Sequence, residues 1–168
     1  MREEFVNIWK NAKSESPKLE FYHVIKKNFG REKYLSHVKT PADRKSLTRL
    51  RISAHNLYIE RGRYQTPLVP REDRFCLHCY IDLGRKVTED EYHALVHCPF
   101  YSHIRNKLNF APISNNHLVD LLADENPSPT QSSSIAKTVN SILSINEKFV
   151  EYYTTPDFHN NFGKCIIF

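Results

Sequence analysis

Three cysteines and one histidine lie near one another in the middle of this 168-residue chain, at a spacing that suits a metal ion. They are Cys76, Cys79, His93 and Cys98, which form a Cys-x2-Cys-x13-His-x4-Cys pattern. Thiolates and an imidazole are typical ligands of tetrahedral zinc, and two cysteines separated by two residues can reach one ion from a tight turn. Four ligands leave no open position, so the pattern predicts one structural Zn2+. Binding of such an ion contributes roughly 10–16 kcal/mol to folding.

The fourth ligand has an alternative. His97 follows His93 by four residues, so both imidazoles would face the same side of a helix. We favour Cys98, because a thiolate binds zinc more strongly and Pro99 ends the helix there. A second alternative is that these are ordinary buried cysteines and helix histidines that fall at metal spacing. A secreted disulfide framework fits poorly, since Cys165 is the one cysteine outside this window and is interpreted as an idle thiol.

The residues around the ligands predict a small hairpin and a helix. Residues 75–80 are expected to form a tight turn, with His78 pointing outward. Residues 81–87, with Gly84 at the turn, fit a short hairpin. The run Thr88–Glu91 has the form of a capping box that opens the helix carrying the histidine ligand. Tyr92, Phe100 and Tyr101 are expected in the core of this segment.

Helical periodicity dominates the rest of the chain. Phe5, Ile8 and Trp9 recur at helical spacing, and Thr40 followed by Pro41 marks a helix start. The apolar stripe of the last expected helix is wide enough to pack on the helical body, which we favour, or on a partner. We expect helices over residues 5–14, 17–30, 40 onward, 102–108, 114–123 and 134–153, with a linker over 126–133.

These elements predict a mainly α fold, a small helical domain with an embedded zinc-bound hairpin-plus-helix module. The expected parts are residues 1–70, a helical region with a basic helix and an arginine-rich loop, 71–110, the zinc module, and 111–168, the C-terminal helices and tail. The charged residues 1–4 and the lack of an apolar run of about 18 residues predict an intracellular protein, nuclear or cytoplasmic, neither secreted nor in a membrane.

Positive charge is concentrated just before the first cysteine. The whole chain has a formal net charge of +5, and residues 43–74 contain eight basic and four acidic residues, a balance of +4. Arginine dominates, and its planar fork can bridge phosphate oxygens. Gly62 lets a backbone approach closely, and Tyr64 supplies a stacking ring. We predict that these residues contact nucleic acid, and we call them the arginine strip: Arg49, Arg51, Arg61, Arg63, Tyr64, Arg71 and Arg74. The alternative is that they form an ordinary solvated surface.

The same region resembles a known family. The runs at 47–55, 59–64, 70–76, 89–93 and 97–101 are similar to the C-terminal region of reverse transcriptases encoded by animal non-LTR retrotransposons. The resemblance extends from Leu47 to Arg105. It implies a Cys-Cys-His-Cys zinc module that follows the polymerase and binds nucleic acid, holding element RNA or target DNA during target-primed reverse transcription. The partners it implies are RNA or DNA and a reverse transcriptase core.

Catalysis is not expected of this chain. No paired-aspartate polymerase motif occurs, and the carboxylates do not cluster as two magnesium ions would require. We therefore expect a non-catalytic nucleic-acid-binding module without a small-molecule substrate. The alternative is a zinc-stabilised helical module that binds another protein, which the long last helix and the modest net charge favour.

Overall fold

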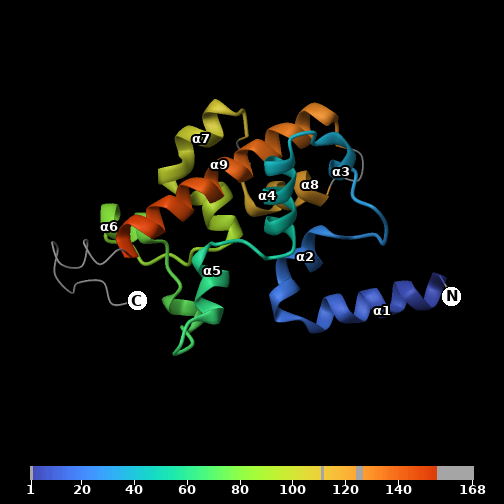
Figure 1. Ribbon diagram of the computed structural model, residues 1–168, viewed down its shortest axis with the longest axis horizontal. Helices are drawn as coiled ribbons and strands as arrows, with labels where there is room; N and C mark the ends of the chain where they lie inside the picture. The colour runs from blue at the N-terminus through green and yellow to red at the C-terminus, as the bar shows by residue number, and fades with distance from the viewer. Residues whose placement is uncertain (1, 111, 124–126, 155–168) are drawn as a thin grey trace.

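The computed structural model describes residues 2–110, 112–123 and 127–154 (Figure 1). Within these ranges the chain is helical, and the one β-type pairing is an isolated antiparallel bridge between Phe75 and Thr88. The mainly α fold class is therefore confirmed. Its α-helices are α1 (Arg2–Glu15), α2 (Glu20–Ile25), α3 (Tyr34–His37), α4 (Pro41–Arg51), α5 (Tyr58–Arg61), α6 (Leu77–Leu83), α7 (Ser102–Lys107), α8 (Asn115–Ala123) and α9 (Pro129–Thr154). Short 3-10 or π turns are η1 (Pro17–Leu19), η2 (Gly62–Tyr64), η3 (Arg71–Asp73), η4 (His93–His97) and η5 (Pro99–Tyr101).

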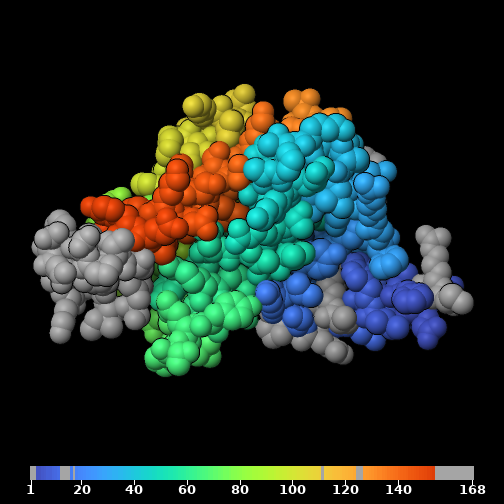
Figure 2. Space-filling model, in the orientation of Figure 1, coloured from blue at the N-terminus to red at the C-terminus, as the bar shows by residue number. Residues whose placement is uncertain are grey.

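The first helix projects from the body at the N-terminal end (Figures 1 and 2). Trp9 packs edge-on against Phe29, with ring centroids 5.6 Å apart. Phe5 and Ile8 remain 59 % and 58 % exposed, so this part of the apolar stripe is not buried by the described residues. The helix expected over 17–30 is shorter than its pattern suggested, because α2 ends at Ile25.

The centre of the molecule is the contact between α4 and α9, which lie side by side (Figure 2). Leu47 and Leu50 of α4 are buried in the same apolar cluster as Val139 of α9. Two hydrogen bonds join the helices through Asn140, whose Oδ1 accepts from Ser46 Oγ at 2.8 Å and whose Nδ2 donates to an Asp43 oxygen at 2.9 Å. The last helix therefore docks on the body, as expected. It begins at Pro129, inside the segment expected to be a linker.

One buried cluster holds apolar residues from the N-terminal helices, the cysteine segment and α9 together. Its members include Phe21, Leu47, Cys76, Cys98 and Ile142. The cysteine sulfurs are thus part of the main core, where close packing removes apolar surface from water. No helix in the described part of the chain is long and apolar enough to cross a membrane.

Candidate metal centre

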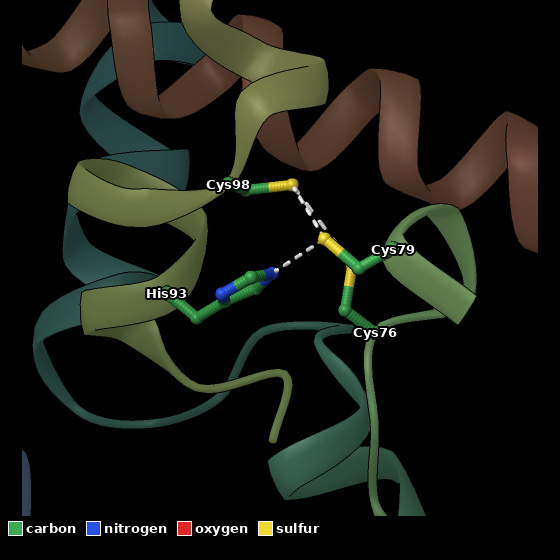
Figure 3. Close-up of side chains that lie close together, drawn as sticks. All are labelled: Cys76, Cys79, His93 and Cys98. Carbon is green, nitrogen blue, oxygen red and sulfur yellow. Dashed lines mark hydrogen bonds between the residues drawn. The ribbon is translucent and has the colours of Figure 1, made fainter. Parts of the chain in front are cut away.

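The four sequence-predicted ligands meet at one buried point (Figure 3). Their donor atoms all lie within 4.8 Å of one another, and the cysteines are free thiols. Cys98 Sγ is 3.9 Å from the sulfurs of both Cys76 and Cys79, and Cys79 Sγ is 3.4 Å from His93 Nε2. Around a tetrahedral zinc, two sulfurs lie about 3.8 Å apart and a sulfur and a nitrogen about 3.5 Å apart. The cluster can hold one metal ion.

The first two ligands are positioned by the start of a helix. Cys76 immediately precedes α6, and Cys79 lies in its first turn. The Cys76 N–H donates to the Val87 carbonyl at 2.7 Å, next to the Phe75–Thr88 bridge. These contacts tie the segment before α6 to the segment that returns after it.

The hairpin expected over 81–87 does not form, because α6 continues to Leu83. Gly84 ends the helix instead, with a φ of 63° in the left-handed region that glycine tolerates best. Its N–H donates to the Tyr80 carbonyl at 3.0 Å. The glycine that the pattern placed in a hairpin turn is therefore a helix C-cap.

The other two ligands flank η4, a wide π turn: His93 is its first residue and Cys98 immediately follows its last. The Cys98 N–H donates to the His93 carbonyl at 2.6 Å, five residues back. This bond closes one π turn and places both side chains on the same side of the turn, toward the cluster. Asp90 caps the start of this helix, since its Oδ1 accepts from the His93 N–H at 2.7 Å. The capping box expected at Thr88–Glu91 is therefore replaced by a single cap at Asp90. Buried Arg105 donates to the Cys98 carbonyl at 2.8 Å and steadies the end of the turn.

His97 lies outside the cluster. It is exposed, and its Nε2 is 2.7 Å from Asn115 Oδ1 at the start of α8. The ring of His97 is therefore engaged with Asn115, away from the three cysteines. The donor group therefore contains Cys98 and not His97.

The surrounding protein stabilises one thiolate more readily than three. The hydrogen bond to Cys98 and burial raise the pKa of the Cys76 thiol above its ordinary value. Burial, with Cys98 nearby, raises the pKa of Cys79 to about 11. Hydrogen bonds with Cys76 and His93 lower the pKa of Cys98 to about 4. A divalent cation supplies the charge that three thiolates need, so binding of the ion and ionisation of the thiols are coupled.

A buried polar network lies beside the ligands, and the sequence reasoning missed it. Glu89 accepts from the Tyr58 N–H and from Asn146 Nδ2, both at 2.6 Å. Burial raises the pKa of Glu89 to about 7. A Glu91 oxygen lies 2.9 Å from His55 Nε2. Burial alone would raise the pKa of Glu91, but the hydrogen bond and the charge of His55 outweigh burial and hold that pKa below its usual value. No local motif signals these pairs, because the partners are 31 to 57 residues apart.

His78 is buried rather than outward-facing, which corrects the expectation. Its ring stacks on Phe100 with centroids 3.6 Å apart, and the tilted ring of Phe149 of α9 lies at the same distance. Burial lowers its pKa to about 4, so the ring is neutral near pH 7. Tyr101 is fully buried, while Tyr92 and Phe100 pack against the core, as predicted.

Two members of the arginine strip are structural, which corrects the prediction for them. Arg74 is 7 % exposed, and its guanidinium donates to the Val69 carbonyl at 2.9 and 2.7 Å and to the Ile59 carbonyl at 2.9 Å. Arg51 is 4 % exposed and donates to the Leu122 carbonyl. Both guanidinium groups are engaged by protein acceptors, so neither is part of an exposed strip beside the metal centre.

The remaining strip members divide into half-buried and exposed residues. Arg49 Nε donates to the Ala54 carbonyl at 2.7 Å, Arg61 lies 4.8 Å from the Tyr58 ring centre, and Arg63 Nε is 2.9 Å from a Glu60 oxygen. Burial lowers the pKa of Arg61. Tyr64, which is 69 % exposed, and Arg71 are open to solvent. The strip is therefore not one continuous exposed surface.

Gly62 also has a different role from the expected one. It is buried, and a Cβ at this position would lie 2.8 Å from Arg74 Cγ. The missing side chain makes room for Arg74 rather than for a ligand backbone.

Comparison of the chain with protein-family models, curated proteins and solved structures found no match.

Proposed function

We propose that this chain is a non-catalytic nucleic-acid-binding module held together by one structural Zn2+. The observation that carries the proposal is the closed set of four buried donors, Cys76, Cys79, His93 and Cys98. Three sulfurs and one imidazole favour zinc over hard cations such as Mg2+ or Ca2+, which take oxygen ligands. A site whose four positions are filled by protein has none for a reacting water, so the ion serves the fold.

The nucleic-acid surface is proposed at the edge formed by η1, η2 and η3. Lys18 Nζ donates to the Tyr64 hydroxyl at 3.0 Å, and Arg71 is exposed nearby, 3.4 Å from Glu20. Lys18, Glu20, Arg63 and Arg71 line one small surface cavity. The Tyr64 ring lies beside it, with its centre 5.6 Å from Lys18 Nζ. An exposed ring beside cations suits a single strand, because bases stack on aromatic rings while cations contact the phosphates.

The resemblance to the C-terminal region of non-LTR retrotransposon reverse transcriptases supports RNA or DNA as the ligand and a reverse transcriptase core as a further partner. In this proposal the chain positions nucleic acid for a polymerase and catalyses nothing itself. An intracellular site of action, nuclear or cytoplasmic, fits three ligands that must remain reduced thiols.

Binding of labelled single-stranded RNA, single-stranded DNA and duplex DNA across a salt series tests the proposal. Tyr64→Ala should weaken single-strand binding by about 1–3 kcal/mol, or roughly 5- to 150-fold, and weaken duplex binding much less. Arg71→Ala should reduce the salt slope on single strands by about 0.7. The matched controls are Tyr152→Ala, an exposed tyrosine on α9, and Arg85→Ala, an exposed arginine after α6.

All variants should be shown to contain one zinc per chain before they are compared. A parent protein that binds none of the three nucleic acids at low salt would overturn the proposal. If the control variants lose as much affinity as Tyr64→Ala and Arg71→Ala, the proposed surface is wrong.

A protein-binding module is the second candidate, and α1 is the observation that favours it. Phe5 and Ile8 expose apolar side chains on a projecting helix, which is typical of a protein-contact surface. Failure of nucleic-acid binding, together with loss of a protein complex on Phe5→Ser/Ile8→Ser, would favour this candidate.

A further inference from the structure

A cationic pocket lies between α2 and α3, away from the metal centre. The connecting loop, residues 26–33, lines a cavity of about 170 Å³ together with Ile25, Arg51 and Ala123. Its charged lining residues are Lys26, Lys27, Arg31, Glu32, Lys33 and Arg51, five cations against one carboxylate, which gives +4. A concave site lined by one sign of charge focuses the electrostatic potential and attracts counter-ions. We call this site the loop pocket.

Part of this charge is used to build the loop. One oxygen of Glu32 lies 3.1 Å from both Lys26 Nζ and Arg51 Nη2. Lys26 also donates to the Gly30 carbonyl at 2.9 Å, and buried Arg51 donates to the Leu122 carbonyl. The Glu32–Arg51 pair ties the loop to the end of α4, and Arg51 in turn is bonded to α8. The single carboxylate of Glu32 is therefore shared between Lys26 and Arg51.

The other three cations lie at the rim. Lys27, Arg31 and Lys33 are exposed, and none of them forms an ion pair with another described residue. The pocket therefore has a surplus of positive charge that the neighbouring acidic groups do not neutralise. An anion held among these side chains lowers their mutual repulsion, and the charge-assisted hydrogen bonds they donate are the strong kind.

The size and the neighbouring ring indicate the chemistry of the anion. The cavity is several times the roughly 30 Å³ that one water molecule occupies in the liquid, so it admits a tetrahedral phosphate. Phe29, on the same loop, is 49 % exposed and can stack on a base. Cations and an exposed aromatic ring on one short loop favour a nucleic-acid strand over a free phosphate.

We propose that the loop pocket binds a phosphate group of a nucleic-acid backbone through Lys27, Arg31 and Lys33, with Arg51 at its floor. This inference rests on the proposed nucleic-acid function and adds a contact site outside the arginine strip. Arg51 is too buried to belong to an exposed strip, but it lines the floor of this pocket and adds positive charge there.

Two measurements on the full zinc-loaded chain test the inference. In the first, inorganic phosphate is titrated while backbone amide NMR signals are recorded, with chloride at matched ionic strength as the control. Phosphate should shift the signals of residues 26–33, and chloride should not. No phosphate-specific shift in this loop overturns the inference.

In the second, affinity for a labelled 20-nucleotide RNA is measured across a salt series for the variant Lys27→Gln/Arg31→Gln/Lys33→Gln. The control Lys45→Gln/Lys107→Gln/Lys137→Gln removes the same charge from exposed positions elsewhere. Loss of two or three phosphate contacts should reduce the salt slope by about 1.4–2.1. We expect an affinity loss of at least about tenfold near 0.1 M salt in the loop variant, and only a small change in the control.

The outcomes separate the two proposals. If the parent binds RNA and the loop variant binds equally well, this inference is wrong while the proposed function stands. If the parent binds no RNA although phosphate shifts the loop signals, the proposed function falls, and the pocket belongs to a free phosphate compound rather than to nucleic acid. Equal losses in the loop variant and the control overturn the inference, because they assign the effect to net charge.

Discussion

The contact between Gly62 and Arg74 gives a quantitative prediction. Gly62 has helical backbone angles, φ −63° and ψ −16°, so alanine can adopt them and would gain about 0.4–1 kcal/mol through the unfolded chain. A Cβ there would lie 2.8 and 2.9 Å from Arg74 Cγ and Cδ. Arg74 cannot swing away without breaking its bonds to the Val69 and Ile59 carbonyls. Overpacking costs about 1–3 kcal/mol, so Gly62→Ala should lower the free energy of unfolding by about 1–2 kcal/mol.

A double-mutant cycle identifies the cause. Arg74→Ala removes the three guanidinium bonds and should itself cost about 2–4 kcal/mol. In that background the space beside Gly62 is open, and Gly62→Ala should become stabilising by about 0.4–1 kcal/mol. The assay is urea unfolding followed by circular dichroism at a fixed zinc concentration. An equal cost of Gly62→Ala in both backgrounds would refute the reasoning, because the clash with Arg74 could not then be its source.

Three further predictions concern the metal centre and its surroundings. Cys98→Ala should reduce the zinc-to-protein ratio from about one to near zero while His97→Ala leaves it unchanged, as elemental analysis can determine; the reverse result would show the ligand choice to be wrong. Because burial raises the pKa of Glu89 from 4.5 to about 7, its contribution to stability is present below pH 4.5 and is lost as the pH rises to 7. The unfolding free energy of the parent relative to Glu89→Gln should therefore fall by ~3 kcal/mol across that range, and a flat difference contradicts the shift. His78→Phe removes two buried ring nitrogens that have no hydrogen-bond partner among the described residues, so it should stabilise the zinc-loaded protein by about 1 kcal/mol in urea unfolding; destabilisation would mean that the ring nitrogens have a role.

Sequence patterns predicted the features that depend on near neighbours. The four donors fall within one short window, so ligand chemistry and spacing were enough to group them. The start of α4 at Pro41 follows from a threonine and a proline in adjacent positions. The late end of α6 shows the limit of this reasoning, because Gly84 suits a hairpin turn and a helix C-cap equally well.

Features that depend on distant partners could not be predicted. Arg51 and Arg74 lie in an arginine-rich stretch that suggested phosphate binding, but both donate to backbone carbonyls. The carbonyl that Arg51 contacts is 71 residues away, and Arg51 also pairs with Glu32. The carboxylate of Glu89 meets Asn146 from 57 residues away. A carbonyl acceptor leaves no trace in composition, so burial of a charged side chain by such bonds becomes visible only in three dimensions.

The long reach of α9 has a consequence for how the chain is completed during synthesis. All four donors lie before residue 99, whereas Asn146 and Phe149 of α9 supply the partners of Glu89 and His78. At 5–20 residues per second, the ribosome needs about 3–10 s to extend the chain from residue 99 to residue 150. Over that interval the apolar side of α4 and the carboxylate of Glu89 lack the residues of α9 that contact them in the folded protein. The four donors are thus present in the chain before the α9 residues that contact Glu89 and His78 have been added.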